Sequence, residues 1–491
     1  MNGMNVAPFI HMIKTPLSTY FYDVNTNKII EVSAEVYNFL KSVARGTETQ
    51  DAFENSEADN RAQTVRRVEE LKKEGYLSAK RPVKCLHGHS DLLEYHLDSN
   101  IEQVTLQLTQ QCNFRCAYCV YTVENFDYQR HHSPKKMPLE VALKTVDFFV
   151  NHSANQKEVC IGFYGGEPLL EFETIKAVVT YAREEFAGKK LKYTITTNGS
   201  LFTFENMGFL EENKFDITVS LDGTPEIHNK SRKFAANGEG TFSAIETNLR
   251  IMKESFPALY KKVNFNVVLD PRNACFDLYA FFNENELFSA NQIRSTLVDD
   301  FFSIEKVVET EAYSIESRIL QFKALLSLLK RYPDNKVSNL VRSTVASAVE
   351  KTETEMREQK ELPDVTSHSG PCIPGQRRLF VDIHGDFYPC ERVSETSDVM
   401  KIGGLESGFD YDKARALLNV SQLTEKECRT CWAIRHCILC ARFCDNNSEL
   451  SAELKLSNCG GVRSSVDNKL RDYIALKELK DFAKGERYER K

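Results

Sequence analysis

Short apolar runs alternate with amphipathic stretches from about residue 96 to residue 315. The runs have the length of buried strands, and the stretches between them, such as 138–152 and 171–186, carry apolar residues at helical spacing. The strand-like runs are VTLQLT, VCIGFYG, KYTITTN, DITVSLDG and NFNVVLD. This alternation predicts an α/β fold with parallel strands and helical crossovers. Five or more such units predict a partial TIM-type barrel with its reactive residues at the carboxyl ends of the strands.

The first 95 residues have a different pattern. Residues 9–33 predict two or three short strands, with a turn at 25–27. Two amphipathic helices follow, one from Ser33 as N-cap to Gly46 and one over 60–77 that is closed by Gly75. A short β-ribbon with two or three helices is typical of a winged-helix-like module.

The rest of the chain divides into segments that differ in composition and in hydrophobic pattern. We expect a charged helical linker over 316–370, a loop-rich cysteine-containing domain over 371–460, and an amphipathic C-terminal helix over 461–491. With the module at 1–95 and the barrel at 96–315, this makes five segments.

Composition narrows the class of protein. A net charge of −7 argues against a nucleic-acid partner, and no apolar run approaches the length of a membrane span. The N-terminus lacks the pattern of a secretory signal, so we expect a cytoplasmic protein. Its 14 cysteines are then reduced, and clustered ones indicate metal ligands. The isolated Cys85, Cys160 and Cys275 are expected to be small buried apolar residues.

The first cysteine group directly follows the first barrel strand. Cys112, Cys116 and Cys119 are spaced CxxxCxxC. Thiolates are the usual ligands of iron–sulfur clusters, whereas structural zinc sites close with four ligands. Three thiols leave one coordination position open, where chemistry can occur. A zinc knuckle or a chance grouping is the alternative.

This spacing, with Tyr118 before the last cysteine, resembles the signature of the radical SAM enzymes. The resemblance implies a [4Fe–4S] cluster on three cysteines, with S-adenosylmethionine (SAM) on the fourth iron. In that family an electron from the cluster cleaves SAM, and the 5′-deoxyadenosyl radical abstracts a hydrogen atom.

Further strand ends resemble the SAM contacts of the same family, in the same order. The GGEP motif is implied to hold the SAM amino group through its backbone and glutamate. The later strand ends are implied to contact the SAM region, then the ribose and sulfonium, and an arginine to pair with the SAM carboxylate. The positions are Gly165, Gly166, Glu167 and Pro168, then Thr197 and Asn198, then Ser220 and Asp222, and finally Arg232. Taken alone, each of these motifs could also be an ordinary turn at the end of a strand.

The second cysteine group is similar to the SPASM extension of radical SAM peptide-modifying enzymes, which binds two auxiliary [4Fe–4S] clusters and brings the total to three. Its members are Cys372, Cys390, Cys428, Cys431, Cys437, Cys440, Cys444 and Cys459. The chain departs from that pattern at position 441, an alanine where the family has cysteine, and it has one extra thiol.

Two assignments of this group remain open. The resemblance implies Cys428, Cys431, Cys437 and Cys459 for one cluster, although Cys440 could replace Cys437. The other cluster then takes Cys372, Cys390 and Cys444. Cys440 is either the fourth ligand of this second cluster or a free thiol. If it is free, one iron of the cluster stays open to a substrate thiolate. A pair of zinc ribbons is the alternative to both clusters.

The N-terminal module resembles the PqqD-type recognition element of peptide-maturation enzymes. The resemblance implies that the leader of a ribosomally made precursor peptide adds as a strand to its sheet edge. The basic side of the second helix suits an acidic leader or is simply a solvated face. A DNA-binding winged helix is the alternative.

Together these resemblances imply a partial (β/α)6 radical SAM barrel with a SPASM domain, and a maturase that forms a thioether between a precursor cysteine and an unactivated carbon. An external electron donor of flavodoxin or ferredoxin type is implied. Carbon–carbon cross-linking, epimerisation and formylglycine formation are alternatives within the class. A non-catalytic iron–sulfur or zinc scaffold that binds peptide is the alternative outside it. No pattern selects a general base.

Overall fold

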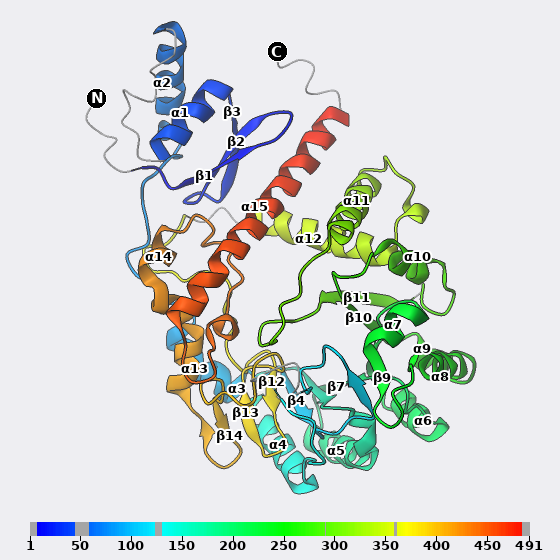
Figure 1. Cartoon of the computed structure of the whole chain (residues 1–491). Coiled ribbons are helices and arrows are strands. Elements are labelled where there is room, and N and C mark those ends of the chain that lie inside the picture. The colour runs from blue at the N-terminus through cyan, green and yellow to red at the C-terminus, as the bar shows by residue number, and fades with distance from the viewer. Residues whose placement is uncertain (1–6, 45–57, 123–129, 290, 358–360, 484–491) are drawn as a thin grey trace.

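Six parallel strands form the centre of the computed structural model, which describes residues 7–44, 58–122, 130–289, 291–357 and 361–483 (Figure 1). The strands neighbour one another in chain order. They are β4 (Gln103–Gln107), β6 (Glu158–Tyr164), β7 (Lys190–Thr197), β8 (Asp216–Ser220), β10 (Val263–Leu269) and β11 (Gln292–Leu297). The predicted α/β fold with a parallel sheet is confirmed, and the five strand-like runs fall on the first five of these strands.

Helices connect the strands as the amphipathic pattern predicts. Their buried stripes pack on the sheet, as Val146 and Phe149 of α4 and Val178 and Val179 of α5 do. The crossover helices are α4 (Leu139–His152), α5 (Phe172–Glu185), α6 (Phe204–Glu212), α8 (Phe242–Ser255) and α10 (Phe276–Glu284), with the short α7 (Pro225–Ser231) and α9 (Pro257–Tyr260) between them.

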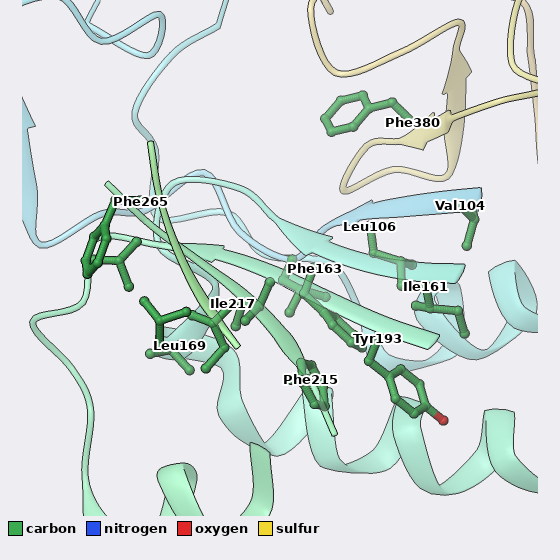
Figure 2. Packing of buried hydrophobic residues seen from close by; sticks show 14 of the residues in the cluster. Val104, Leu106, Ile161, Phe163, Leu169, Tyr193, Phe215, Ile217, Phe265 and Phe380 are labelled. Carbon is green, nitrogen blue, oxygen red and sulfur yellow. The ribbon is translucent and has the colours of Figure 1, made fainter. Parts of the chain in front are cut away.

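Aromatic rings pack against one another in the core of the sheet. The ring centroids of Phe163 and Phe215 are 5.8 Å apart, and those of Tyr193 and Phe215 are 5.2 Å apart (Figure 2). Burial of each such side chain stabilises the fold by about 1.5–3 kcal/mol. The packed side chains hold the strands in register, so that the carboxyl ends of the strands form a fixed platform.

The segment after Cys372 extends this sheet. Strand β12 (Leu379–Val381) pairs in parallel with β4, placing Phe380 opposite Thr105. Three short antiparallel strands follow it outward: β13 (Asp386–Tyr388), β14 (Gly403–Gly404) and β15 (Gly408–Phe409). The 371–460 segment therefore begins as part of the central sheet before it becomes loop-rich.

The N-terminal module is a three-stranded antiparallel sheet with two helices. Its strands are β1 (Ile10–Lys14), β2 (Thr19–Asp23) and β3 (Lys28–Val32), and its helices are α1 (Ala34–Ala44) and α2 (Ala58–Lys73). Asn27 (φ +57°) makes the predicted turn and Gly75 (φ +91°) follows α2 as expected. Gly46 lies outside the described residues. The winged-helix and PqqD-like interpretations stay predictions.

The module is docked on the long helix α15 (Ala452–Ala483), which Figure 1 shows rising from the cysteine-rich region to the module. Tyr20 and Tyr22 pack with Val466 and Leu470 of α15. His11 of β1 stacks on Trp432 with ring centroids 3.5 Å apart. The module and the second cysteine group are thus in direct contact.

Further helices complete the C-terminal half: α11 (Glu311–Leu328), α12 (Asn339–Arg357), α13 (Tyr411–Leu418) and α14 (Glu425–Thr430), while α3 (Leu93–Ser99) precedes β4. Glu355 of α12 accepts hydrogen bonds from His436 and from Lys469 of α15. Within the described ranges, none of the helices combines the length and the apolar character that crossing a bilayer requires.

Candidate active site

The first cysteine group occupies the loop after β4, at the carboxyl edge of the sheet. Cys116 ends a short strand, β5 (Phe114–Cys116), and the N–H of Cys119 donates to the Cys116 carbonyl over 3.0 Å. The N–H of Phe114 points at Cys112 Sγ, 3.3 Å away. Burial raises the pKa of the Cys112 thiol to about 12, and the nearby Glu167 raises it further. Ligand binding there must displace the thiol proton, as metal binding does.

Strand β5 pairs with β9 (Arg232–Phe234), and this pairing places Cys116 opposite Arg232. The Arg232 guanidinium holds Asp222 through two bonds, from Nε over 2.8 Å and from Nη2 over 3.2 Å. Tyr118 donates its hydroxyl to the same carboxylate. Asp222 and Arg232 are buried, and Tyr118 is half-buried. The structure thus brings Tyr118, Asp222 and Arg232 together beside the cysteine group, although they come from three different segments.

The GGEP loop after β6 presses on the cysteine loop. Gly166 N–H donates to Thr109 O over 2.7 Å, and Glu167 N–H donates to Gln111 O over 2.9 Å. A Cβ on Gly165, whose φ is +141°, would lie 2.5 Å from Thr109 O. Only glycine allows the two backbones to approach this closely. The motif therefore sets the position of Cys112, which follows Gln111 directly.

Glu167 joins the ends of β6 and β7 (Lys190–Thr197). Its carboxylate accepts from Leu169 N over 3.1 Å, from Thr197 Oγ1 over 2.7 Å and from Asn198 N over 2.7 Å. Burial raises its pKa to about 7, and these three donors act in the opposite direction. The Asn198 side chain in turn donates to Asn113 in the cysteine loop over 2.8 Å.

The remaining predicted positions of this set lie where expected along the sheet edge. Pro168 starts a single 3₁₀ turn after Glu167, and Ser220 is the half-buried last residue of β8. Together with the side chains above, every predicted SAM-contact position lies at or just beyond the carboxyl end of a parallel strand, or on the β5–β9 pair.

A buried polar cluster beside Cys119 was not predicted. Arg130, only 2% exposed, donates from Nη2 to Glu391 O over 2.7 Å and lies 3.6 Å from Glu395 Oε2. Gln107, the last residue of β4, donates to Glu395 over 2.8 Å and to the Tyr121 hydroxyl over 2.8 Å. Burial raises the pKa of Glu395 to about 7. The cluster ties the triad loop to the segment after Cys390. Its one sequence signal is a polar Gln at a strand end.

Several members of the second cysteine group lie near one another. Burial and the nearby charges of Cys431, Cys428 and Cys459 together raise the pKa of Cys437 to about 11. Cys428 and Cys459 also act on Cys431, and Cys428 acts on Cys459, so these four thiols form one set of neighbours. Cys459 and Cys428 act on Cys444 as well. The assignment of individual thiols to clusters, with Cys437 or with Cys440, stays a prediction.

The other set gathers around Cys440. Burial raises the pKa of Cys390 to about 12, and the charges of Cys372 and Cys440 raise it further. Cys440 has the same effect on Cys444. Gly370, just before Cys372, lies so close to the backbone of Leu439 that a side chain could not fit between them. Cys440 therefore accompanies Cys372, Cys390 and Cys444 in the fold.

The donor sets fit iron–sulfur clusters by their chemistry. All 14 cysteines are free thiols. Among the described residues, no three His, Cys, Asp or Glu side chains lie close enough to share a single metal ion. In a four-iron cluster each thiolate binds a different iron, so the ligands stay further apart than those of one zinc ion. Sets made only of thiols match the preference of such clusters.

Comparison with protein families agrees with this geometry. Residues 106–274 match the model of the Radical SAM superfamily. This span includes the triad, the GGEP loop and Arg232, and it runs from β4 to just beyond β10. The family implies SAM and a [4Fe–4S] cluster as cofactors.

Proteins with similar sequences include a radical SAM cyclopropyl synthase and anaerobic sulfatase-maturating enzymes. The radical SAM cyclopropyl synthase TigE of Paramaledivibacter caminithermalis is 23% identical over 337 residues, which covers 64% of this chain and 69% of that enzyme. The cysteine-type anaerobic sulfatase-maturating enzyme of Clostridium perfringens is 25% identical over 356 residues, covering 70% and 88%. That of Clostridium novyi is 30% identical, but the match covers only 33% of this chain and 41% of that enzyme. These matches relate the chain to such enzymes.

The fold matches a solved structure as well. The structure of native anSMEcpe with bound AdoMet superimposes with a TM-score of 0.55 at 20% identity, covering 78% of this chain and 99% of that one. This likeness shows a shared radical SAM α/β fold with a central parallel sheet.

Proposed function

We propose that this chain is a radical SAM/SPASM maturase that installs a thioether between a cysteine and an unactivated carbon of another residue in a ribosomally synthesised precursor peptide. The observation that carries the proposal is the thiol count. Eight cysteines of the second group lie outside the triad, more than SAM cleavage alone requires. The proposal therefore has three [4Fe–4S] clusters, one on the triad and two auxiliary.

The chemistry needs an electron acceptor near the substrate. Cys112, Cys116 and Cys119 would hold a cluster that, with SAM bound, would supply a 5′-deoxyadenosyl radical able to take a hydrogen atom from the acceptor residue. The precursor thiol then loses its proton and bonds to that carbon, and one electron leaves. The auxiliary sets provide a place for this electron. A flavodoxin- or ferredoxin-type protein would supply the electron that starts each turnover.

Within the chain, Arg232 of β9 and Asp222 just beyond β8 would orient SAM, since Arg232 lies opposite Cys116 and Asp222 accepts from Tyr118. The GGEP backbone would border the same space because it fixes the position of the cysteine loop. These side chains bind and orient, and the carbon–sulfur chemistry depends on where the precursor lies.

The N-terminal module offers a surface for the precursor leader. Strand β3 is an edge of its sheet, since the order is β1-β2-β3. A cavity of about 950 Å³ lies between the end of β3, the start of α1 and α2. Glu31, Val32, Gln63 and Arg67 contribute to its lining. A strand added there would gain main-chain hydrogen bonds from β3 and specificity from these side chains.

Carbon–carbon bond formation in a peptide is the second candidate. The similarity to a cyclopropyl synthase over 64% of the chain favours it. Both reactions remove two hydrogen atoms from the peptide, but only thioether formation consumes a thiol.

The test is anaerobic reconstitution followed by turnover with a cysteine-containing precursor encoded near the gene. We expect about twelve irons per chain for three four-iron clusters, release of 5′-deoxyadenosine, and a product that has lost two hydrogens and resists thiol alkylation at one cysteine. A Cys116→Ala variant is the matched control and should release none. A product that has lost two hydrogens yet alkylates in full would establish the carbon–carbon alternative. A colourless zinc-loaded protein that leaves SAM intact would contradict both.

A further inference from the structure

Lys455 is a charged residue on the apolar face of α15. It lies on the same face of the helix as Cys459, Val462 and Val466, which follow it at helical spacing, and its exposed fraction is 0%. The expected position of a lysine on an amphipathic helix is the solvent side. A fully buried lysine therefore requires partners that compensate for the loss of water.

Three acceptors surround its amino group. Lys455 Nζ lies 3.0 Å from Val420 O, 2.8 Å from Thr424 Oγ1 and 3.3 Å from Cys428 Sγ. Three is the number of hydrogen bonds that an ammonium donates, which indicates that the site is built for the charged form.

The partner that can carry the opposite charge is the sulfur. In the described part of the chain, no carboxylate oxygen lies within 4.0 Å of Lys455 Nζ. A buried ammonium without a counter-charge is strongly destabilising. Cys428 becomes anionic when it binds metal, because coordinating thiols are deprotonated. The positive charge of Lys455 is thus balanced by a direct partner only when Cys428 is a thiolate.

Lys455 also lies beside a second cysteine of the same proposed ligand set. Cys459 follows one turn later on α15, and its Sγ lies 3.5 Å from Lys455 O. Two of the four proposed ligands are therefore neighbours of this lysine.

We propose that Lys455 is a fixed cation that neutralises an anionic iron–sulfur cluster held by Cys428, Cys431, Cys437 and Cys459, and that it makes this cluster easier to reduce. The proposal rests on the auxiliary clusters of the proposed function, and it adds the residue that adapts one of them to accept an electron. Net charge and hydrogen bonds to sulfur are two of the factors that set the reduction potential of such clusters. Lys455 supplies both to Cys428.

The experiment is a redox titration of the full-length reconstituted enzyme, without precursor, followed by electron paramagnetic resonance. Lys455→Met removes the charge and keeps the length of the side chain. Lys455→Arg keeps the charge. Lys477→Met makes the same substitution at an exposed position of the same helix and is the matched control.

We expect Lys455→Met to lower the equilibrium constant for reduction of one auxiliary cluster at least tenfold, which is about 59 mV for one electron. The arginine and Lys477→Met variants should stay near the wild-type potential. A Lys455→Met protein with full iron and an unchanged potential would overturn the proposal.

If Lys455→Met loses one cluster, Lys455→Gln is titrated in its place. Loss of the same cluster in both neutral variants, with retention in Lys455→Arg, supports the charge role. Loss in the arginine variant too would mean that packing matters instead, and would overturn it. A wild-type iron content of only one cluster would instead refute the auxiliary sites of the proposed function.

Discussion

Substitution of Gly166 by alanine should separate the GGEP loop from the cysteine loop. The new Cβ would lie 2.6 Å from the carbonyl carbon of Gln111, the residue that directly precedes Cys112. Non-bonded carbons pack at about 3.5–4.0 Å, so the two backbones would have to move apart by about 1 Å. No flexible side chain can absorb this shift, because both obstructing segments are backbone.

The cost of this shift can be worked out from the contacts that it breaks. The hydrogen bonds from Gly166 N–H to Thr109 O and from Glu167 N–H to Gln111 O both cross the interface. Their loss at about 1 kcal/mol each, with about 1–3 kcal/mol for overpacking, lowers the free energy of unfolding by about 3–5 kcal/mol. A displacement of about 1 Å at a reacting centre can also slow the reaction about 100-fold.

Two measurements on the anaerobically reconstituted protein check this prediction: chemical unfolding and the rate of 5′-deoxyadenosine release. Gly208→Ala is the matched control, since a Cβ there meets only Phe256 at an ordinary 3.8 Å. Within α6 that substitution should stabilise the protein by about 0.5–1 kcal/mol. If Gly166→Ala kept wild-type stability and wild-type SAM cleavage, the close approach would not position Cys112, and the reasoning would be wrong.

Three other changes test the site and its supports. Glu167→Gln places an amide N–H₂ group against backbone N–H donors. It should lower the free energy of unfolding, measured with urea, by about 1–3 kcal/mol. Glu173→Gln, at an exposed position, should leave this free energy unchanged. Gly460→Ala, in the interior of α15 with nothing within 4 Å, should raise stability by about 1 kcal/mol, and an unchanged melting temperature would contradict this. At Glu355, burial raises the pKa, but hydrogen bonds from a histidine and a lysine outweigh it and lower the pKa from 4.5 to about 2. Its stabilisation is therefore complete above pH 4.5 and lost as the pH falls toward 2. Glu355→Gln should flatten this slope in acid unfolding curves and cost about 2 kcal/mol at pH 7.

The alternating strands and helices of the α/β region could be predicted because the apolar residues of each element follow the spacing of a strand or of a helix. The chemistry at the strand ends could be predicted too, since the cysteine spacing and the GGEP run are local in sequence. Strand β11, in contrast, has the sequence QIRSTL, and four of its six residues are exposed. Strands β13 to β15 have two or three residues each, too few to show any period.

The unpredicted parts of the site depend on contacts between distant segments. Arg130 meets Glu395 across 265 residues of sequence, and only the parallel pairing of β12 with β4 brings them together. Asp222 and Arg232 were predicted as separate contacts to a ligand, whereas the structure pairs them with each other. Lys455 could be noticed in the sequence as a charge on the apolar face of a helix, but its partners lie in a 3₁₀ turn and in α14, 27–35 residues earlier.

The pairing of β12 with β4 also determines how the enzyme can be divided. Strand β4 is the first strand of the barrel, and the 379–381 segment covers its outer side. A fragment that stops before residue 371 would bare the backbone N–H and C=O groups of a strand whose side chains Val104 and Leu106 are fully buried. An uncovered apolar edge of this kind recruits strands from other molecules. The two halves therefore fold as one unit, and exchange of the cysteine-rich half between related enzymes would succeed only if the junction included β12.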